Sequence, residues 1–239
     1  MVRTLLRLAL CLSVLFVSAC ASHTEIPFDR AAATDVKRIG VVQPAFPTNS
    51  SVILATSVGQ NFGLIGALVD AGMKSNREQH IDTLLTEQKF GPKAEFSSAL
   101  RTALQNRGYE PVDIVPVRKG NEFVAPGAYA GQPSVDAYLD IVVSNYGFLA
   151  AGVANSAPYR PIIYLQCRLL SAKDPTRVLM FDTILVNPLG TPKDAVTISA
   201  PEAYAFVDFD TLMSDPARAA EGLAKAIDQS ADTVGTVLN

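Results

Sequence analysis

Short runs of β-branched and other apolar residues recur along this chain and predict strands. These runs cover residues 36–42, 109–112, 135–148, 159–171 and 176–187. Proline, glycine and small polar residues separate them, as is typical of strands that end at turns or loops. The last two runs are joined by Ala172-Lys173-Asp174-Pro175, and an Asp-Pro pair between two apolar runs predicts a hairpin turn.

Two other segments repeat apolar residues at helical spacing. Phe96, Leu100 and Leu104 recur every four positions, and Gly108 follows as a helix-ending residue. Residues 216–237 place alanine, leucine and isoleucine on one face in the same way. Strands combined with such helices predict a single α+β domain, in which helices pack on one face of a mixed sheet of about four to five strands.

Residues 52–73 differ from both patterns, because they carry no charge before Asp70 and are interrupted by glycines. Two of these glycines form a G-x-x-x-G pair, which in membrane spans lets helices approach closely. The candidate residues for an assembly or membrane contact are Gly59, Phe62, Gly63 and Gly66. Polar residues interrupt the run, so a glycine-rich loop that leads into a helix packed on the core is the favoured alternative. A polar helix over residues 74–88 is expected to follow.

The N-terminal twenty residues predict the compartment of the protein. Arg3 and Arg7 precede an apolar run over residues 8–17, which is shorter than the roughly twenty residues that a transmembrane helix needs. This combination is typical of a secretory signal peptide, which is removed from the mature protein. The segment ends in Val17-Ser18-Ala19-Cys20, which resembles the lipobox of bacterial lipoproteins. An ordinary signal peptide and a single membrane anchor are the alternatives.

The lipobox resemblance implies cleavage before Cys20 and a diacylglycerol on its thiol. Residue 21 is alanine rather than the aspartate that favours inner-membrane retention, so we expect a protein anchored in the outer membrane and facing the periplasm. The expected division of the chain is a signal peptide over residues 1–19, a tether over 20–35 and a periplasmic α+β domain over 36–239. A glycine-rich insertion near residues 50–90 belongs to that domain.

Composition limits the partners and the covalent cross-links. The chain is 49% hydrophobic and 18% charged, so it is expected to fold around a core. Its formal net charge is −3 and no basic cluster exceeds two adjacent residues, so no nucleic acid partner is expected. Cys167 is the one thiol left once Cys11 is removed and Cys20 is lipidated, which excludes an intramolecular disulfide in the mature protein. It lies in an apolar run and is expected to be buried and inert.

The sequence contains no recognisable catalytic or metal-binding pattern. His23 and His80 lack the neighbouring ligands of a zinc site. A phosphate-binding loop and a G-x-S-x-G nucleophile elbow are also missing from the sequence. We therefore predict no enzyme activity, no metal and no cofactor.

Paired carboxylates are the one alternative to that prediction. Asp136 and Asp140 share a face of a predicted strand, and Asp208 and Asp210 form a second pair. Hydrolases of cell-wall sugars use such pairs of acids. Turn capping and solvation are the favoured roles, and Asp182 is expected to face solvent.

Six aromatic residues are candidates for a recognition surface, because tyrosine combines contact area with a hydrogen bond. They are Tyr129, Tyr138, Tyr146, Phe148, Tyr159 and Tyr164. The segment over residues 145–161 is mostly small and uncharged, and it is interpreted as an exposed loop. Core packing of the same rings is the alternative.

The order of these elements resembles a broad group of envelope lipoproteins. The resemblance rests on the lipobox and on the segments Lys37–Val42, Gly108–Val112 and Val135–Ile141. The group includes curli-secretion-channel lipoproteins, lipoprotein activators of penicillin-binding proteins, and domains similar to the amino-terminal domain of TolB. It supplies no catalytic residues, and the long insertion between Pro44 and Pro92 departs from the compact activators.

These features together predict a non-catalytic outer-membrane lipoprotein that binds or scaffolds another envelope component. Its expected partners are the membrane, through the lipid anchor, and an envelope protein. Assembly into a homo-oligomer is a further alternative. The alternative is an oligomeric membrane-inserting or secretion-channel component that uses residues 52–73.

Overall fold

The computed structural model describes residues 25–31, 33–56, 63–153 and 158–239. Its strands are β1 (Arg38–Val42), β2 (Ser51–Thr56), β3 (Glu110–Ile114), β4 (Ala137–Val153), β5 (Tyr159–Ser171), β6 (Val178–Val186) and β7 (Val196–Ile198). Its α-helices are α2 (Gly63–Glu87), α3 (Pro92–Asn106), α4 (Phe209–Ser214) and α5 (Pro216–Thr236). Short 3₁₀ turns lie at Pro126–Tyr129 and Glu202–Tyr204.

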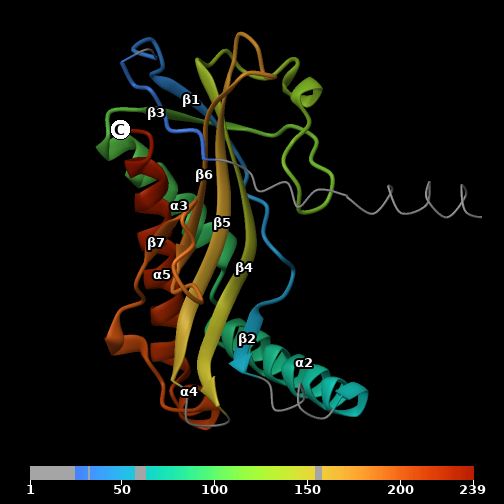
Figure 1. The fold of residues 1–239 in the computed structure, drawn as a ribbon. Helices are drawn as coiled ribbons and strands as arrows, with labels where there is room; N and C mark the ends of the chain where they lie inside the picture. Colours follow the sequence, from blue (N-terminus) through green and yellow to red (C-terminus); the bar gives the residue numbers. More distant parts are fainter. Residues whose placement is uncertain (1–24, 32, 57–62, 154–157) are drawn as a thin grey trace, which may run out of the picture.

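The strands of the described residues all belong to one mixed sheet (Figure 1). Six of them follow the order β3-β1-β4-β5-β6-β7, and β2 pairs with β4 on the same edge as β1. The five predicted strands are confirmed, and the predicted hairpin joins β5 to β6 in antiparallel register. The expected total of four to five strands is wrong, because the sheet has seven. The pattern does not predict β2, which lies in the glycine-rich segment, or β7, which has only three residues.

Strand β4 is the longest element of the sheet and connects its two ends. Its 17 residues span about 55 Å at the usual rise of a strand. Its first residues pair in parallel with β1, and its last residues pair in parallel with β2. Gly147 lies where β2 begins, with a φ of +142°, and a Cβ there would lie 2.1 Å from the carbonyl oxygen of Ser51. Only glycine lets β2 approach β4 this closely.

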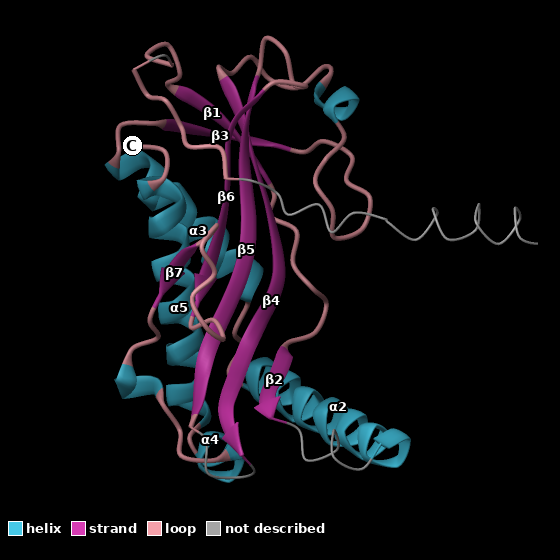
Figure 2. Cartoon of the chain, in the orientation of Figure 1, coloured by secondary structure: helices cyan, strands magenta, loops and turns pink. Residues whose placement is uncertain are grey.

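Helices α3 and α5 lie side by side on one face of this sheet (Figure 2), as the α+β prediction expected. The main core lies between these helices and the sheet, where Phe96, Leu100 and Leu104 of α3 are fully buried. Pro92 begins α3, and Gly108 follows its end with a φ of +81°, a left-handed conformation that glycine adopts without strain. The four-residue spacing therefore identifies both the helix and the face that packs.

A second, smaller core covers part of the opposite face. It is formed by Val42, Ile114, Val124, Tyr129, Tyr138 and Leu170. The connection between β3 and β4, residues 115–136, supplies two of these side chains. The rings of Tyr129 and Tyr138 stack with their centroids 4.4 Å apart. The part of the sheet that contains β1 and β3 is therefore covered on both faces.

The aromatic residues that were candidates for a recognition surface do not form one. Five of the six are buried, and Tyr164 is half-buried. The interpretation of the segment over residues 145–161 as an exposed loop is also wrong for its described strand residues, because β4 continues to Val153 and β5 begins at Tyr159. Residues 154–157 lie outside the described residues. Phe148, for example, meets Phe206 edge to face inside the main core, with ring centroids 6.1 Å apart. Core packing of these rings, the alternative interpretation, is confirmed.

The described part of the expected tether lies against the domain. Ile26 forms an antiparallel bridge with Phe181 of β6, and both backbone hydrogen bonds of the bridge are made. Phe28 and Val36 pack against the main core. Residues 25–31 and 33–36 are therefore attached to the folded body rather than free of it.

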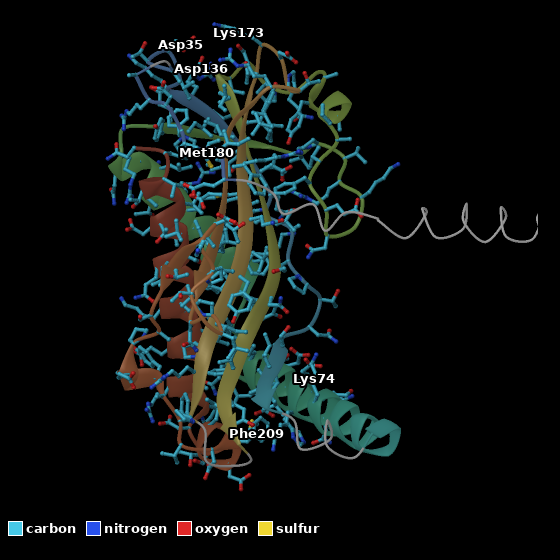
Figure 3. All side chains as sticks on the ribbon, viewed as in Figure 1. Asp35, Lys74, Asp136, Lys173, Met180 and Phe209 are labelled. Carbon is cyan, nitrogen blue, oxygen red and sulfur yellow. The ribbon has the colours of Figure 1, made fainter. Side chains whose placement is uncertain are left out.

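A cluster of charged residues lies at the end of the molecule where β1 begins. Figure 3 shows Asp35, Lys173 and Asp136 near one another where the N-terminal segment meets β1 and the β5–β6 turn. Lys173 Nζ lies 3.0 Å from Asp35 Oδ2, and both side chains are exposed. The Asp136 carboxylate accepts the backbone N–H groups of Lys37 and Arg38, at 2.9 and 2.7 Å. The capping role expected for Asp136 is confirmed.

Candidate functional site

Helix α2 contains the part of the glycine-rich segment that the structure describes as helical. The helix runs from Gly63 to Glu87, so this segment and the predicted polar helix are one continuous element. Ile81, Leu84 and Leu85, near its C-terminus, are buried in the main core. Its N-terminal half extends away from the sheet (Figure 1). Its 25 residues measure about 37 Å, so it reaches well beyond the body of the domain.

Two carboxylates of α2 hold the helix across the open edge of β2. The backbone N–H of Ser50 donates to Asp82 Oδ1 at 2.8 Å, and that of Val52 donates to Glu78 Oε1 at 3.1 Å. Asp82 and Glu78 are four residues apart and therefore lie on one face of the helix. Because β2 pairs with β4 on its other side, these amides need acceptors from outside the sheet. Helix α2 supplies those acceptors.

An arginine and two aromatic rings form the base of α2. Arg77 Nη1 donates to the hydroxyl of Tyr159 at 2.6 Å, and its guanidinium carbon lies 5.9 Å from the centre of that ring. The same carbon lies 5.2 Å from the ring centre of Phe209, which Figure 3 labels at the start of α4. These cation–π contacts connect α2 to β5 and α4. An open cleft of about 620 Å³ lies beside them, lined by Gly72, Asn76, Arg77, His80, Phe209, Asp210 and Met213.

The sequence-predicted assembly residues fall in and before the projecting part of α2. Gly63 begins the helix and Gly66 lies in its first turn. Gly59 and Phe62, like the predicted lipidation site Cys20, lie outside the described residues. Over the part of the chain that the structure describes, no helix combines the length and apolarity needed to span a membrane.

Asp140 lies at the centre of a buried charged network on the face of the smaller core. Its carboxylate is fully buried and lies 2.7 Å from Arg118 Nη2 and 3.2 Å from Arg168 Nη2. It also accepts the backbone N–H of Val124 at 2.8 Å and the hydroxyl of Tyr129 at 3.2 Å. Burial, and secondarily the charge of Asp140, raises the pKa of Tyr129, so this tyrosine is a neutral donor. The solvated role expected for Asp140 is wrong, because two arginines and a backbone amide compensate its burial.

Asp182 is also buried, contrary to the expectation that it faces solvent. The residue is 4% exposed, and it lies on the same face of β6 as Met180 and Ile184, which belong to the main core. Its Oδ1 accepts the backbone N–H of Thr183 at 2.7 Å. Burial raises the pKa of this carboxyl to about 6, and the nearby charge of Glu25 acts in the same direction.

The second predicted acid pair consists of a helix cap and a cleft residue. Asp208 accepts the backbone N–H of Thr211 at 2.7 Å and caps α4, and this hydrogen bonding lowers the pKa of its carboxyl. Asp210 lines the cleft at the base of α2. The capping expected for Asp208 is confirmed. The two acids therefore have different surroundings, and Asp208 does not line this cleft.

The remaining candidates for chemistry have ordinary structural surroundings. Cys167 is fully buried, as expected, and burial raises the pKa of its thiol. His80 lies on α2 with its ring centre 6.3 Å from that of Phe209. Among the residues that the structure describes, no group of three or more His, Cys, Asp or Glu side chains could hold a metal ion.

Arg118 and Arg168, like Arg77, Glu78 and Asp82 of α2, are charged residues that the sequence interpretation missed. Arg168 lies opposite Asp140 in the β4–β5 register, so strand alternation alone would have placed the two on the same face. Arg118 comes from the irregular connection after β3, where no periodicity indicates a direction. Comparison with known proteins adds no further candidate, since no family model and no curated protein matches this chain.

Proposed function

We propose that this protein is a non-catalytic lipoprotein of the outer membrane that faces the periplasm and binds another envelope component. The observation that carries the proposal is the projection of α2 beyond the sheet (Figure 1). The sequence of its first seven residues, Gly63–Val69, contains no charged residue and is mostly aliphatic. An apolar helical segment beyond the body of its own domain gains stability by packing against another macromolecule.

The structural contacts of the ionisable groups support a role without catalysis. Asp140 is bound by two arginines, and Cys167 lies inside the main core. Asp208 caps a helix and Asp136 caps the first amides of a strand. Groups that are engaged in this way hold the fold together and are not presented to a substrate.

The N-terminal segment restricts how far the body can lie from its proposed anchor. Ile26 is fixed on β6, and six peptide steps separate it from Cys20. A fully extended chain of that length reaches about 20 Å. With a lipid on Cys20, the part of β6 that pairs with Ile26 is therefore held near the membrane, and the distance between the bilayer and the body that carries α2 is limited.

A photo-crosslinking amino acid at Leu68 of α2 tests this proposal in intact envelopes. We expect an adduct of defined mass from Leu68 and none from the same crosslinker at Lys225, an exposed position on α5 that serves as the matched control. Failure of Leu68, Gly63 and Gly66 positions to give any adduct above the Lys225 background would contradict the proposal. Replacement of Cys20 by serine should also release the protein from the membrane fraction.

The second candidate function is a homo-oligomer that uses the same segment as a membrane-inserting or secretion-channel component. The same projecting helix favours it. Strand β2 is already paired with β4, so among the described residues of the predicted segment it is the helical part that is available for this role. An adduct of twice the protomer mass from Leu68, and a shift to monomer in detergent on Gly63→Leu, would favour the oligomer over a different partner.

A further inference from the structure

The free edge of the sheet ends in the most exposed apolar residues of the described chain. Strand β3 has no partner on its outer side within the described sheet. Directly after it, Val115 and Val117 are 81% and 78% exposed. The two valines lie two positions apart in a segment without regular secondary structure, and they offer two neighbouring exposed apolar side chains.

The N-terminal part of the β3 edge cannot pair with a further strand, whereas its C-terminal part can. Alternate residues of β3 turn their backbone groups toward β1, beginning with Glu110, whose N–H donates to Lys37. Pro111 lies in the outward set and has no N–H, and its carbonyl accepts a hydrogen bond from Arg101 Nη1 at 3.2 Å. Pairing with another strand is therefore blocked there, whereas the outward groups of Asp113 and Val115 carry no such block.

Two adjoining cavities flank the open end of β3. One measures about 500 Å³ and the other about 390 Å³, and Gln43, Pro44, Ile114 and Val115 line both. They lie at the carboxyl ends of the parallel strands β1 and β3. The chain after β1 runs beside β4, through the bridge of Ala45 to Val142, whereas the chain after β3 covers the opposite face. Crevices at such divergent strand ends are the usual ligand sites of parallel sheets.

The charge around these cavities is positive, although the whole chain has a net charge of −3. Arg101 lines the first cavity and pairs with Asp113. Lys93 and Arg118 line the second. Arg118 shares the single carboxylate of Asp140 with Arg168, so this network keeps one excess positive charge. The groove therefore complements an acidic ligand.

We infer that the open end of β3 and its two cavities bind an extended, acidic and apolar peptide segment of a partner protein. The segment adds beside Asp113 and Val115 as a short strand, its apolar side chains contact Val115 and Val117, and its carboxylates face Lys93 and Arg118. This surface lies on the β3 edge and not on α2, so the inference does not depend on the assignment of α2 as a contact site.

Peptide binding to the mature protein in detergent tests this inference. The probe is a fluorescein-labelled hexapeptide of alternating glutamate and valine, and the matched control peptide has lysine in place of glutamate. We expect binding of the acidic peptide that Val115→Asp and Lys93→Glu each weaken by about tenfold or more. Val207→Asp should leave binding unchanged, because Val207 is another valine that is 67% exposed and lies outside both cavities.

Three results would overturn the inference. The first is no detectable binding of the acidic peptide at about 1 mM. The second is equal binding of the lysine peptide, or equal loss of binding in Val207→Asp. The third is self-association that Val115→Asp abolishes in the absence of peptide binding, which would assign the edge to a second copy of this chain. Crosslinking from Leu68 is unaffected by Val115→Asp in each case, so failure of the two proposals is distinguishable.

Discussion

The sheet buries one aspartate on each face, and the surroundings of the two carboxylates differ sharply. Asp140, in the smaller core, accepts four hydrogen bonds, two of them from arginines. Asp182, in the main core, accepts the backbone N–H of its neighbour Thr183, and burial raises the pKa of its carboxyl to about 6. The Asp140 carboxylate helps to hold an irregular connection to the sheet, whereas burial of the Asp182 carboxylate destabilises the fold.

The difference follows from what covers each face. Residues 115–136 have no regular secondary structure apart from one 3₁₀ turn, and they attach to the sheet through polar contacts with Asp140 as well as through Val124 and Tyr129 of the smaller core. Helices α3 and α5 attach through apolar side chains and offer no cation to Asp182 in its described contacts. A buried carboxylate is tolerated when partners compensate its desolvation, and it destabilises the fold when they do not.

Replacing Asp140 should produce the largest loss of stability. Asp140→Asn leaves Arg118 and Arg168 without their shared anion while both side chains remain mostly buried. We expect a loss of about 3–5 kcal/mol in the free energy of unfolding, measured by urea denaturation at pH 7.5. Asp136→Asn, which keeps an acceptor for the β1 amides at a more exposed site, is the matched control and should lose much less. Equal losses in the two variants would remove the distinction between a compensated buried charge and a surface cap.

Replacing Asp182 should have the opposite sign. Its pKa is raised from 3.8 to about 6, and one pKa unit corresponds to about 1.4 kcal/mol. Asp182→Asn keeps an acceptor for the Thr183 N–H and removes the buried charge, so we expect a stabilisation of about 2–3 kcal/mol at pH 7.5. Differential scanning calorimetry or urea denaturation of both proteins checks this value.

The pH dependence of the same variant provides the internal control. An acid whose folded pKa lies above its unfolded pKa binds more protons when folded, so stability falls as the pH rises from about 4 to about 6 and is constant above. Acids with lowered pKa values act in the opposite direction in both proteins, so the quantity to compare is the difference in stability between Asp182→Asn and the wild type, which should grow from about pH 4 to about pH 6. A stabilisation that is as large at pH 4 as at pH 7.5 would show that ionisation of Asp182 is not its cause.

The same two residues show how far the sequence could predict this fold. Alternation along β6 places Asp182 between Met180 and Ile184, so periodicity indicates the buried face, while the polarity of aspartate indicates solvent. In the structure Asp182 is buried, as periodicity indicates, whereas the prediction from polarity placed it in solvent. Periodicity alone could not predict the surroundings of Asp140, because its partner Arg118 comes from an irregular connection 22 residues away.

Regular elements were predictable where one pattern acted alone. Helices α3 and α5 and five strands follow from apolar spacing, whereas β2 lies in an uncharged run that continues, with glycines and polar residues in it, into α2. The pairing of β2 with β4 depends on Gly147, almost a hundred residues further along the chain. The cavities beside β3 also join residues from β1, α3 and β3, so no local pattern indicates them.

Asp82 is less buried than Asp140 and Asp182, and its replacement should change the free energy of unfolding by less than theirs. It is half-buried and accepts the edge amide of Ser50 at 2.8 Å. Asp82→Ala should cost about 1–2 kcal/mol, because a hydrogen bond to a charged acceptor is lost while water can reach the amide. Urea denaturation gives the cost, and faster hydrogen exchange at the Ser50 amide locates it at the β2 edge. Glu87→Ala, at the exposed end of α2, is the matched control and should change neither quantity.

The smallest effect is expected at the exposed pair of Lys173 and Asp35, where solvent replaces the lost partner. Hydrogen bonding and the charge of Lys173 lower the pKa of Asp35, yet both side chains lie in water, which screens the interaction. Lys173→Ala should therefore leave the unfolding midpoint unchanged within error and should not increase proteolysis of residues 25–36. Ile26→Pro removes the N–H that donates to the Phe181 carbonyl at 2.8 Å, so it should make the same segment markedly easier to cleave. If Lys173→Ala released the segment as readily as Ile26→Pro, a surface charge would do what we assign to strand pairing and apolar packing. The proposed difference between buried and exposed charges would then not hold for the exposed pair of Lys173 and Asp35.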